Sequence, residues 1–431
     1  MDGFKPSQRK VLFSCLKRKL SSEIKVSQLA GYVSEHSAYH HGEASLQNTI
    51  INMAQEYVGS NNIPLLVPSG QFGTRIMGGK DHSSPRYIFT KLQDYTTKYF
   101  QESDSAILKQ LEDDGMKIEP EWYAPPIPLI LVNGSDGIGT GWSTKIPAHD
   151  PRVVTECVRA VLRGASDDEL PTLKPWYQGF EGTIEERAGS KGQIYESRGI
   201  LQFGTKKHTI DILELPVGTW TEDYKEWLEH QTSDSKKTGI KSFKNNSTEA
   251  TVHFTITIAN DASARCKIVK AYKNRDTDTL MEQLKLVSSL SYKNMNAFGV
   301  DGAIHSFRHP YEIIRAFVRV RTQVYEKRRQ KIIQSLRATC RTLSEKMRFL
   351  SLVIDGTLEL RNVPKKTIEE QLKHNSFAAP FDPYLTMPLW SITREKVDAL
   401  RTQCETHAKE LKRVSQQTGN DLWEEDLKTL S

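Results

Sequence analysis

A tyrosine beside an arginine is the first feature of this sequence that could carry chemistry. Tyr87 follows Arg86 in the run Ser-Ser-Pro-Arg-Tyr-Ile. A phenol has a pKa of about 10 and is a poor nucleophile until a neighbouring cation favours the phenoxide. Arg86 could hold a phosphate oxygen beside it, which suits attack of Tyr87 on a phosphate group. Most Tyr-after-Arg pairs are structural, so both interpretations stay open here. Other cations that could reach the same site are Arg75, Lys80, His40 and His41.

A glycine-dense run at 133–142 holds a second candidate. Its glycine spacing is not that of a phosphate-binding P-loop, and no strand–loop–helix unit with a ribose-binding acid follows. The run is therefore interpreted as a tight turn with close backbone approach. Ile138 is unusual there, because an apolar side chain in a glycine loop is suited to wedging between nucleic-acid bases.

The sequence offers no convincing metal ligands. His40 and His41 are adjacent and lack the i, i+4 spacing of ligands on one helix face, so phosphate contact or a turn is favoured. The five cysteines lie far apart without a C-x-x-C pair, which excludes a disulfide framework or a cysteine-rich zinc module. We therefore expect no metal site within this chain.

The elements that must position these residues begin with a basic, helical stretch at 5–25. Lys5, Arg9 and Lys10 belong to it, and they are candidates for phosphate contacts. A short helix at 28–35 and a longer one from Glu43 to about Tyr57 resemble a helix-turn-helix. Residues 59–82 are rich in Gly, Asn and Pro and are expected to form a β-hairpin wing. Together these elements predict a winged-helix domain.

The rest of the chain predicts a multidomain α+β protein. Residues 251–258 alternate apolar and polar side chains, as in a half-buried strand, and 209–215 is expected to be another. Apolar residues then recur at helical spacing from Ile313 to Leu350 and again from Val397 to Val414. Two long helices around a compact insert predict an antiparallel coiled coil with a small domain at its tip.

Composition limits the class of protein. The chain has 431 residues, 37% hydrophobic and 26% charged, with a net charge of +6, so two or three folded domains are expected. No apolar run approaches the roughly 20 residues that cross a bilayer, so we expect no membrane partner. The beginning of the chain has no apolar segment of a secretory signal.

Several ordered motifs resemble the breakage-reunion region of eukaryotic type IIA DNA topoisomerases. Shorter matches at 219–225 and 421–423 extend the resemblance over nearly the whole chain. The main motifs are DGFKPSQRK at 2–10, YHHGE at 39–43, GSNN at 59–62, QFGTR at 71–75, GGKD at 78–81, PRYIFT at 85–90, EPEWY at 119–123 and VNG at 132–134.

The resemblance implies roles for individual residues. Tyr87 matches the nucleophile that becomes joined to a DNA 5′-phosphate, and Arg86 matches the residue that steadies the scissile phosphate. Lys5 and His41 match backbone contacts, and Ile138 matches a residue that intercalates and bends the duplex. The expected partners are double-stranded DNA and a second copy of the chain, and the expected compartment is the nucleus. Phosphate contacts by Arg9, Lys10 and Arg75 are inferred only from charge and position.

The resemblance also divides the chain into three regions. These are a winged-helix DNA-binding domain at 1–126, an α/β tower at 127–265, and a coiled coil with a dimerising C-terminal gate at 266–431. The family's ATPase domain and its acidic, Mg²⁺-binding TOPRIM domain match nothing here. ATP and Mg²⁺ are therefore expected to be cofactors of a longer protein, and the chain alone is expected to cleave DNA poorly.

Two acidic groups, Glu102/Asp104 and Asp276/Asp278, imitate the TOPRIM metal ligands but follow Tyr87, the reverse of the family's order. They are not expected to bind metal. Two other functions stay open. One is a catalytically silent, dimeric DNA clamp, and the other is a sequence-specific winged-helix regulator, which the long coil and tower make less suitable.

Overall fold

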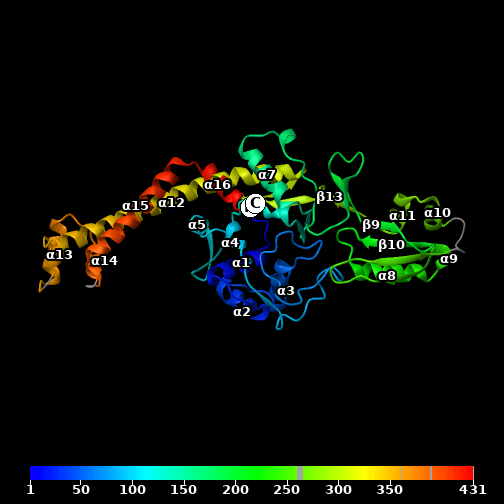
Figure 1. The fold of residues 1–431 in the computed structure, drawn as a ribbon, viewed down its shortest axis with the longest axis horizontal. Coiled ribbons are helices and arrows are strands. Elements are labelled where there is room, and N and C mark those ends of the chain that lie inside the picture. Colours follow the sequence, from blue (N-terminus) through cyan, green and yellow to red (C-terminus); the bar gives the residue numbers. More distant parts are fainter. Residues whose placement is uncertain (260–265, 361, 389–390, 431) are drawn as a thin grey trace. The chain divides into compact units, whose positions relative to one another are not determined.

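The computed structural model describes residues 1–259, 266–360, 362–388 and 391–430. The chain forms two compact units: unit 1 contains Met1–Arg321 and Asp426–Ser431, and unit 2 contains Thr322–Glu425 (Figure 1). The expected division of residues 1–265 into two domains is finer than this and remains a prediction. None of the helices among the described residues is long and apolar enough to cross a membrane.

Three helices at the beginning of unit 1 pack against one another: α1 (Pro6–Arg18), α2 (Val26–Ser37) and α3 (Glu43–Ala54). Pro6 begins α1, as expected from its fixed φ angle. Each helix buries one apolar face, which includes Leu12, Leu29 and Ile50. The three predicted helices are confirmed, although α2 is longer at both ends and α3 ends three residues early.

The expected β-hairpin at 59–82 is wrong. Residues 59–82 contain turns and loops, and their two β-bridges are made with residues outside the segment, Leu66 with Leu92 and Ser69 with Phe89. Repeated glycines explain the difference, because Gly70 and Gly73 adopt positive φ angles that interrupt a strand. The segment instead folds back onto the short sheet of β1 (Ile24–Lys25) and β2 (Phe89–Thr90). The winged-helix assignment therefore remains a prediction.

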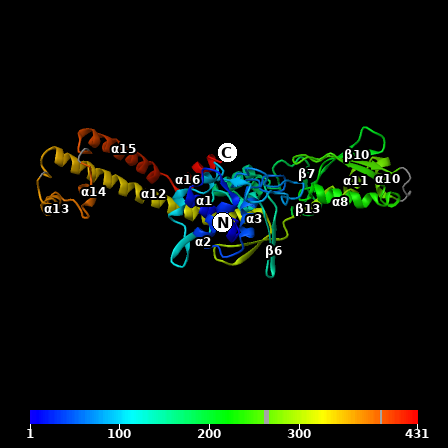
Figure 2. The ribbon, with the colours of Figure 1, turned by 90° about the horizontal axis from the view of Figure 1, so that it is seen from below.

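Unit 1 also contains hairpins at its surface. The β3–β4 hairpin (Gln110–Asp113, Met116–Pro120) carries mostly exposed residues. The expected glycine turn is confirmed as the β5–β6 hairpin (Ser135–Gly139, Trp142–Ile146), which projects from unit 1 in Figure 2. A further hairpin, β14–β15 (Met295–Phe298, Ile304–Phe307), lies beside β6.

The α/β part of unit 1 is built on two antiparallel sheets. One has the strand order β11-β12-β10-β9 and the other β13-β8-β7. The two predicted strands are confirmed as β10 and β12. Side chains of α8 and α10 pack on the first sheet, where Tyr224 meets Phe254 at a ring distance of 5.3 Å. The elements are β7 (Thr183–Glu186), β8 (Ile194–Arg198), β9 (Ile200–Phe203), β10 (Thr209–Glu214), β11 (Ile240–Asn245), β12 (Phe254–Ile258), β13 (Val287–Ser291), α8 (Thr221–Thr232), α10 (Lys267–Asn274) and α11 (Thr277–Gln283).

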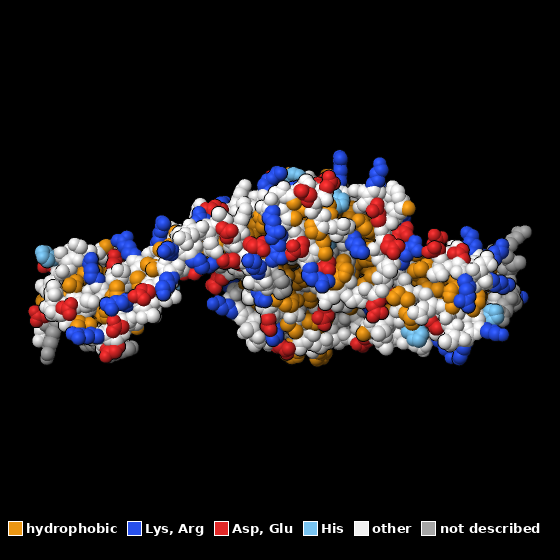
Figure 3. All heavy atoms as spheres, turned by 45° about the horizontal axis from the view of Figure 1, so that its top comes forward, with side chains coloured by type: hydrophobic (Ala, Val, Ile, Leu, Met, Phe, Trp, Pro, Cys, Tyr) orange, Lys and Arg blue, Asp and Glu red, His pale blue; other side chains and the backbone are white. Residues whose placement is uncertain are grey.

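Longer and shorter helices complete unit 1. Helix α7 begins where Asp150 accepts a hydrogen bond from the backbone of Arg152. On the face shown in Figure 3, acidic and basic side chains are mixed rather than gathered in one patch, in keeping with the small net charge. The remaining helices are α4 (Thr96–Tyr99), α5 (Glu102–Ser105), α6 (Leu129–Val132), α7 (Pro151–Leu162) and α9 (Ser235–Thr238).

Unit 2 consists of helices around its own core. Helix α12 (Pro310–Ile354) enters it from unit 1, and α15 (Arg394–Gln416) runs beside α12 in the opposite direction. This direction follows from two contacts: the Tyr325 and Trp423 rings stack at 5.0 Å, and Cys404 lies 3.9 Å from the carbonyl of Cys340. The predicted helices are thus present, while their coiled-coil packing remains a prediction. The other helices are α13 (Lys365–His374), α14 (Asp382–Leu385) and α16 (Gly419–Lys428).

Candidate nucleic-acid interface

Tyr87 lies in a turn that is fixed to the beginning of α2. The Tyr87 backbone donates to the carbonyl of Ser84 at 2.9 Å, which closes the turn. The first N–H groups of α2 donate back to it, Val26 to Ile88 at 3.0 Å and Ser27 to Pro85 at 3.1 Å. A helix otherwise leaves these N–H groups without backbone partners. The turn that carries the tyrosine and the helix therefore complete each other's hydrogen bonding.

Buried and paired residues flank the exposed tyrosine. The Tyr87 side chain is 76% exposed, whereas the next residue, Ile88, is 1% exposed. Gly70 leaves room for Ile88, since a β-carbon there would come within 3.0 Å of the isoleucine. Phe89 exchanges two backbone hydrogen bonds with Ser69, at 2.9 and 3.1 Å. The phenol thus stands on a rigid base with open access to a large substrate.

Arg86 and Lys80 are exposed, as contacts to a nucleic-acid phosphate require. Arg86 is adjacent to Tyr87 on the same turn. Lys80 lies at the end of the segment 71–83, which is joined at its ends by a hydrogen bond from Ser83 to Gln71. The sequence prediction for these cations is compatible with their exposure.

Arg75 is a correction to the predicted interface. Its side chain is 6% exposed and makes two hydrogen bonds to the carboxylate of Glu214, which is 3% exposed. Such a buried, two-point pair occupies the guanidinium and keeps it away from solvent. Charge and position in the sequence could not reveal the partner, because Glu214 lies 139 residues away on β10.

Arg9 and Lys10 are corrections of the same kind. Arg9 pairs with Asp2 at 2.9 Å, and Lys10 pairs with Glu119 at 2.9 Å; both cations are only 16% exposed. Asp2 also accepts a hydrogen bond from the backbone of Tyr123 at 2.7 Å. These ion pairs hold the beginning of the chain against residues 119–123, which is a structural role in place of the expected phosphate contact.

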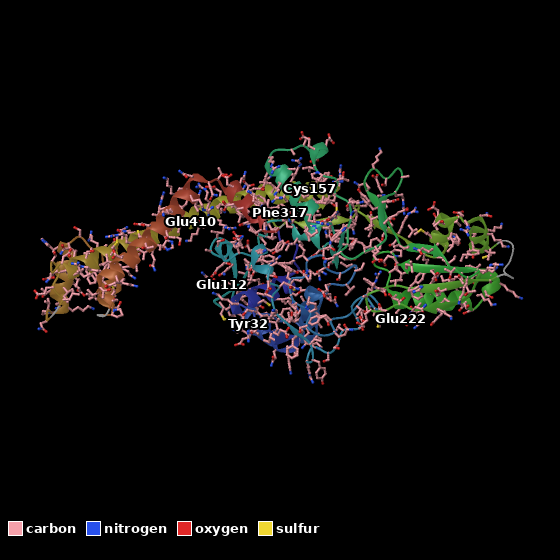
Figure 4. The ribbon with its side chains drawn as sticks, viewed as in Figure 1. Tyr32, Glu112, Cys157, Glu222, Phe317 and Glu410 are labelled. Carbon is pink, nitrogen blue, oxygen red and sulfur yellow. The ribbon has the colours of Figure 1, made fainter. Side chains whose placement is uncertain are left out.

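The two adjacent histidines face different neighbours. His40 Nε2 lies 3.0 Å from a carboxylate oxygen of Asp113, beside Glu112 on the β3–β4 hairpin (Figure 4). The ring of His41 meets Tyr39 edge-on at 5.4 Å. Both histidines are exposed at the turn between α2 and α3. His41 therefore offers a ring nitrogen to an external partner, whereas His40 already has an acidic partner.

Lys5 and Ile138 come together at the β5–β6 hairpin. The Lys5 ammonium donates to the carbonyl of Asp136 at 3.0 Å. An ammonium has three donors, so this bond leaves two for an external phosphate. Ile138, two residues along the same strand, is 91% exposed. Lys5 also lines a cavity of about 670 Å³ together with Lys145, a cation that the sequence prediction did not include.

The described residues do not fit a magnesium site. No group of three or more His, Cys, Asp or Glu side chains is placed among them to hold a metal ion. Of the acidic residues that imitate metal ligands, Asp104 pairs with Arg321 at 2.8 Å and Asp276 caps α11 through Thr279. Asp278 pairs with Arg198 at 2.8 Å. These carboxylates have structural partners, so no step of a reaction is assigned to a metal held by them.

Sequence reasoning missed three exposed apolar side chains. Trp142 is 51% exposed, Phe298 70% and Val300 52%. Each lies next to or near a glycine at the tip of a hairpin. A large apolar residue inside a predicted glycine turn is the signal that identified Ile138, and the same signal could have identified these residues.

The chain is similar along its length to a protein family of known members. A family model for DNA gyrase/topoisomerase IV, of the A-type component, matches residues 1–428. The curated relatives include a mitochondrial DNA topoisomerase 2 of Dictyostelium discoideum, 38% identical over all of this chain and 33% of the relative. The mouse DNA topoisomerase 2-alpha is 40% identical, over 99% of this chain and 30% of the relative. The chain thus spans about a third of these relatives.

A solved structure shares the fold. It is the DNA-binding, cleavage and re-ligation domain of Plasmodium falciparum topoisomerase II, with a TM-score of 0.90 and 37% sequence identity. The match covers 99% of this chain and 60% of that one.

Proposed function

Since this chain belongs to the DNA gyrase/topoisomerase IV family, we propose that it is the part of a type II DNA topoisomerase that binds, cleaves and rejoins duplex DNA. One observation carries the proposal: Tyr87 is 76% exposed on a turn held by hydrogen bonds to α2, directly beside the exposed Arg86. A phenol meant for the core would be buried, whereas a phenol that attacks a polymer must be accessible.

The proposed reaction exchanges one phosphodiester for another. The Tyr87 phenol oxygen attacks a DNA phosphorus and forms a bond to the 5′-phosphate. The bond between phosphorus and the 3′-oxygen breaks, and the proton lost by the phenol is balanced by the proton gained at that oxygen. The two phosphodiesters have similar energy, so the 3′-hydroxyl can reverse the reaction and rejoin the strand.

Arg86 is the residue on this turn that can stabilise the transition state. Its guanidinium carries a permanent charge and several donors that suit the oxygens of a phosphate. The rigid turn fixes the backbone from which Arg86 and Tyr87 extend, so fewer conformations must be lost on binding. Lys80 and His41 are proposed to add contacts to the DNA backbone, together with Lys5.

The finer architecture belongs to the same proposal. Helices α1–α3 would form a winged-helix DNA-binding domain, the sheets of unit 1 a tower, and the long helices of unit 2 a coiled coil that joins two copies of the chain. Two copies are needed because each tyrosine cuts one strand, and a second duplex passes through the double-strand break. Ile138 would intercalate and bend the duplex.

Mg²⁺ and ATP are proposed as cofactors of the longer protein. In phosphoryl chemistry a bound Mg²⁺ supplies stabilisation for the leaving oxygen. A nuclear location is proposed from the family alone, and the mitochondrial name of the Dictyostelium relative shows that the family is not confined to one compartment.

A trapping assay tests the proposed chemistry. The chain is mixed with Mg²⁺ and a pre-nicked duplex labelled on its 3′ or its 5′ end, with or without the acidic half of a topoisomerase. We expect a protein-linked band that keeps the 3′ label and loses the 5′ label, strongest when the acidic half is present. Tyr87→Phe should abolish the band without weakening DNA binding.

The same assay separates the rival function. A clamp that binds DNA without cutting would give no adduct in any mixture, and Tyr87→Phe would change nothing. An adduct that persists in Tyr87→Phe would contradict the assignment of the nucleophile. Equal affinity for unrelated duplexes would dispose of a sequence-specific regulator.

A further inference from the structure

Two neighbouring hairpins of unit 1 end in exposed apolar side chains. Ile138 and Trp142 lie at the tip of the β5–β6 hairpin, 91% and 51% exposed. Phe298 and Val300 lie at the tip of the β14–β15 hairpin, 70% and 52% exposed. These four are half of the large apolar residues that are exposed among the described residues. We call them the apolar tips.

Hydrogen bonds place the two hairpins side by side. The backbone of Lys145 donates to the carbonyl of Asn294 at 2.7 Å, and the Asn296 side chain donates to the carbonyl of Ser143 at 2.8 Å. The strands β6 and β14 therefore run in opposite directions. Two residues further along this register, Phe298 is level with Gly141, next to Trp142 at the turn.

The tip of the β14–β15 hairpin is ordered by its own contacts. The Asp301 carboxylate accepts from the backbone of Ala303 at 3.1 Å and lies 3.0 Å from a ring nitrogen of His305. Gly299 allows this approach, because a β-carbon there would come within 2.5 Å of Asp301. Phe298 and Val300 are thus exposed on a defined turn, where burial of an apolar side chain is worth about 1.5–3 kcal/mol.

We infer that Phe298 and Val300 contact the DNA duplex together with Ile138, as a second apolar wedge that packs into the minor groove where the duplex bends. The inference rests on the proposed function and extends its site to a hairpin to which sequence reasoning assigned no role. Apolar wedges at base steps are a general means by which proteins hold DNA bent.

Charge around the tips favours a nucleic acid over a second protein surface. Lys5 is bonded to the carbonyl of Asp136 on the first hairpin, and the exposed Lys145 follows on β6. Lys293 precedes the second hairpin and is also exposed. Cations flanking an apolar tip match a groove with phosphates along both edges.

DNA bending measures the contribution of the second tip. The 431-residue chain is titrated onto a duplex of about 30 base pairs with a fluorescent donor and acceptor at its ends. Four variants are compared with the unchanged chain: Phe298→Ser, Val300→Ser, Ile138→Ala and, as a control, Met116→Ser. Met116 is 52% exposed at the tip of the β3–β4 hairpin, so it matches the change in exposure and chemistry.

We expect Phe298→Ser to weaken binding of the bent duplex about tenfold, as loss of one buried aromatic contact does, and to lower the transfer signal at saturation. Val300→Ser should have a smaller effect in the same direction, and Met116→Ser none. Unchanged thermal unfolding would show that the fold is intact.

Three results would overturn the inference. If Ile138→Ala lowers bending but Phe298→Ser does not, the second wedge is wrong while the proposed function stands. If Phe298→Ser instead shifts the sedimentation of the protein without DNA, the tip joins two protein chains. If the unchanged chain binds no duplex, the proposed function fails as well.

Discussion

At the scale of single residues, the Arg75–Glu214 ion pair is the strongest interaction that links distant parts of unit 1. Both side chains are at most 6% exposed. Removing one partner of a buried pair leaves an uncompensated charge and costs about 3–5 kcal/mol. We therefore expect Arg75→Met to lower the free energy of unfolding by that amount, measured by denaturant titration. Arg75→Met with Glu214→Leu should recover most of the loss.

Lys80 is the matched comparison for Arg75, because it is exposed. Lys80→Met should leave unfolding unchanged and reduce the slope of DNA affinity against salt by about 1, as loss of one phosphate contact does. A reduced slope in the stable double variant of Arg75 and Glu214 would contradict the structural role given to Arg75.

His149 gives unit 1 a pH dependence. It is fully buried between the carbonyl of Leu131 and the hydroxyl of Tyr292, and burial lowers its pKa from the ordinary 6.5 to about 4. A histidine with a lowered folded pKa contributes stability above pH 6.5, and this is lost as the pH falls through 4. We expect a loss of about 3 kcal/mol over this window, measured by unfolding at several pH values. His149→Gln should flatten the dependence; an equal slope in this variant would contradict it.

The residues that sequence reasoning placed well are those whose function depends on exposure. Tyr87 and Ile138 lie in turns, and turns can be predicted from Gly and Pro. Arg9, Lys10 and Arg75 were placed wrongly because each is paired with an acid that is distant or not distinctive in the sequence. A cation in a basic region carries no mark of its buried partner, so only the tertiary structure could separate these three from Lys5.

At the scale of elements, the Tyr87 turn depends on the packing of the residue next to it. Ile88→Ala should create a cavity, cost about 2–4 kcal/mol and loosen the turn, so the yield of trapped adduct should fall more than DNA affinity. Ile256→Ala is the control, because this residue is equally buried in the β12 strand. If both variants lose adduct in proportion to their stability, the turn has no special positioning role.

Helices and regular strands were predicted more closely than loops, for a physical reason. The apolar periodicity of α2, α3, β10 and β12 reports burial of one face and is written in neighbouring residues. The segment 59–82 has no such repeat. Its β-bridges, Leu66 with Leu92 and Ser69 with Phe89, are made beyond its own ends, so composition indicated a hairpin that does not form.

At the scale of the whole molecule, the two units have separate cores and should unfold separately. Leu372, on α13, is fully buried in the core of unit 2, and Ile256 is fully buried in the sheet core of unit 1. Each substitution to Ala should cost about 2–5 kcal/mol and lower only one of two calorimetric transitions. A single transition that both variants shift equally would show that the units unfold together.

The ion pair between Arg75 and Glu214 has a consequence for dividing the gene into smaller pieces. Residue 75 belongs to the region that the sequence assigns to DNA binding, and residue 214 to the region assigned to the tower. A shortened protein that stops between them would expose the apolar surroundings of one charge and strip it of its counterion. The smallest well-behaved fragment that displays Tyr87 should therefore extend past β10, however compact the first 126 residues look in the sequence.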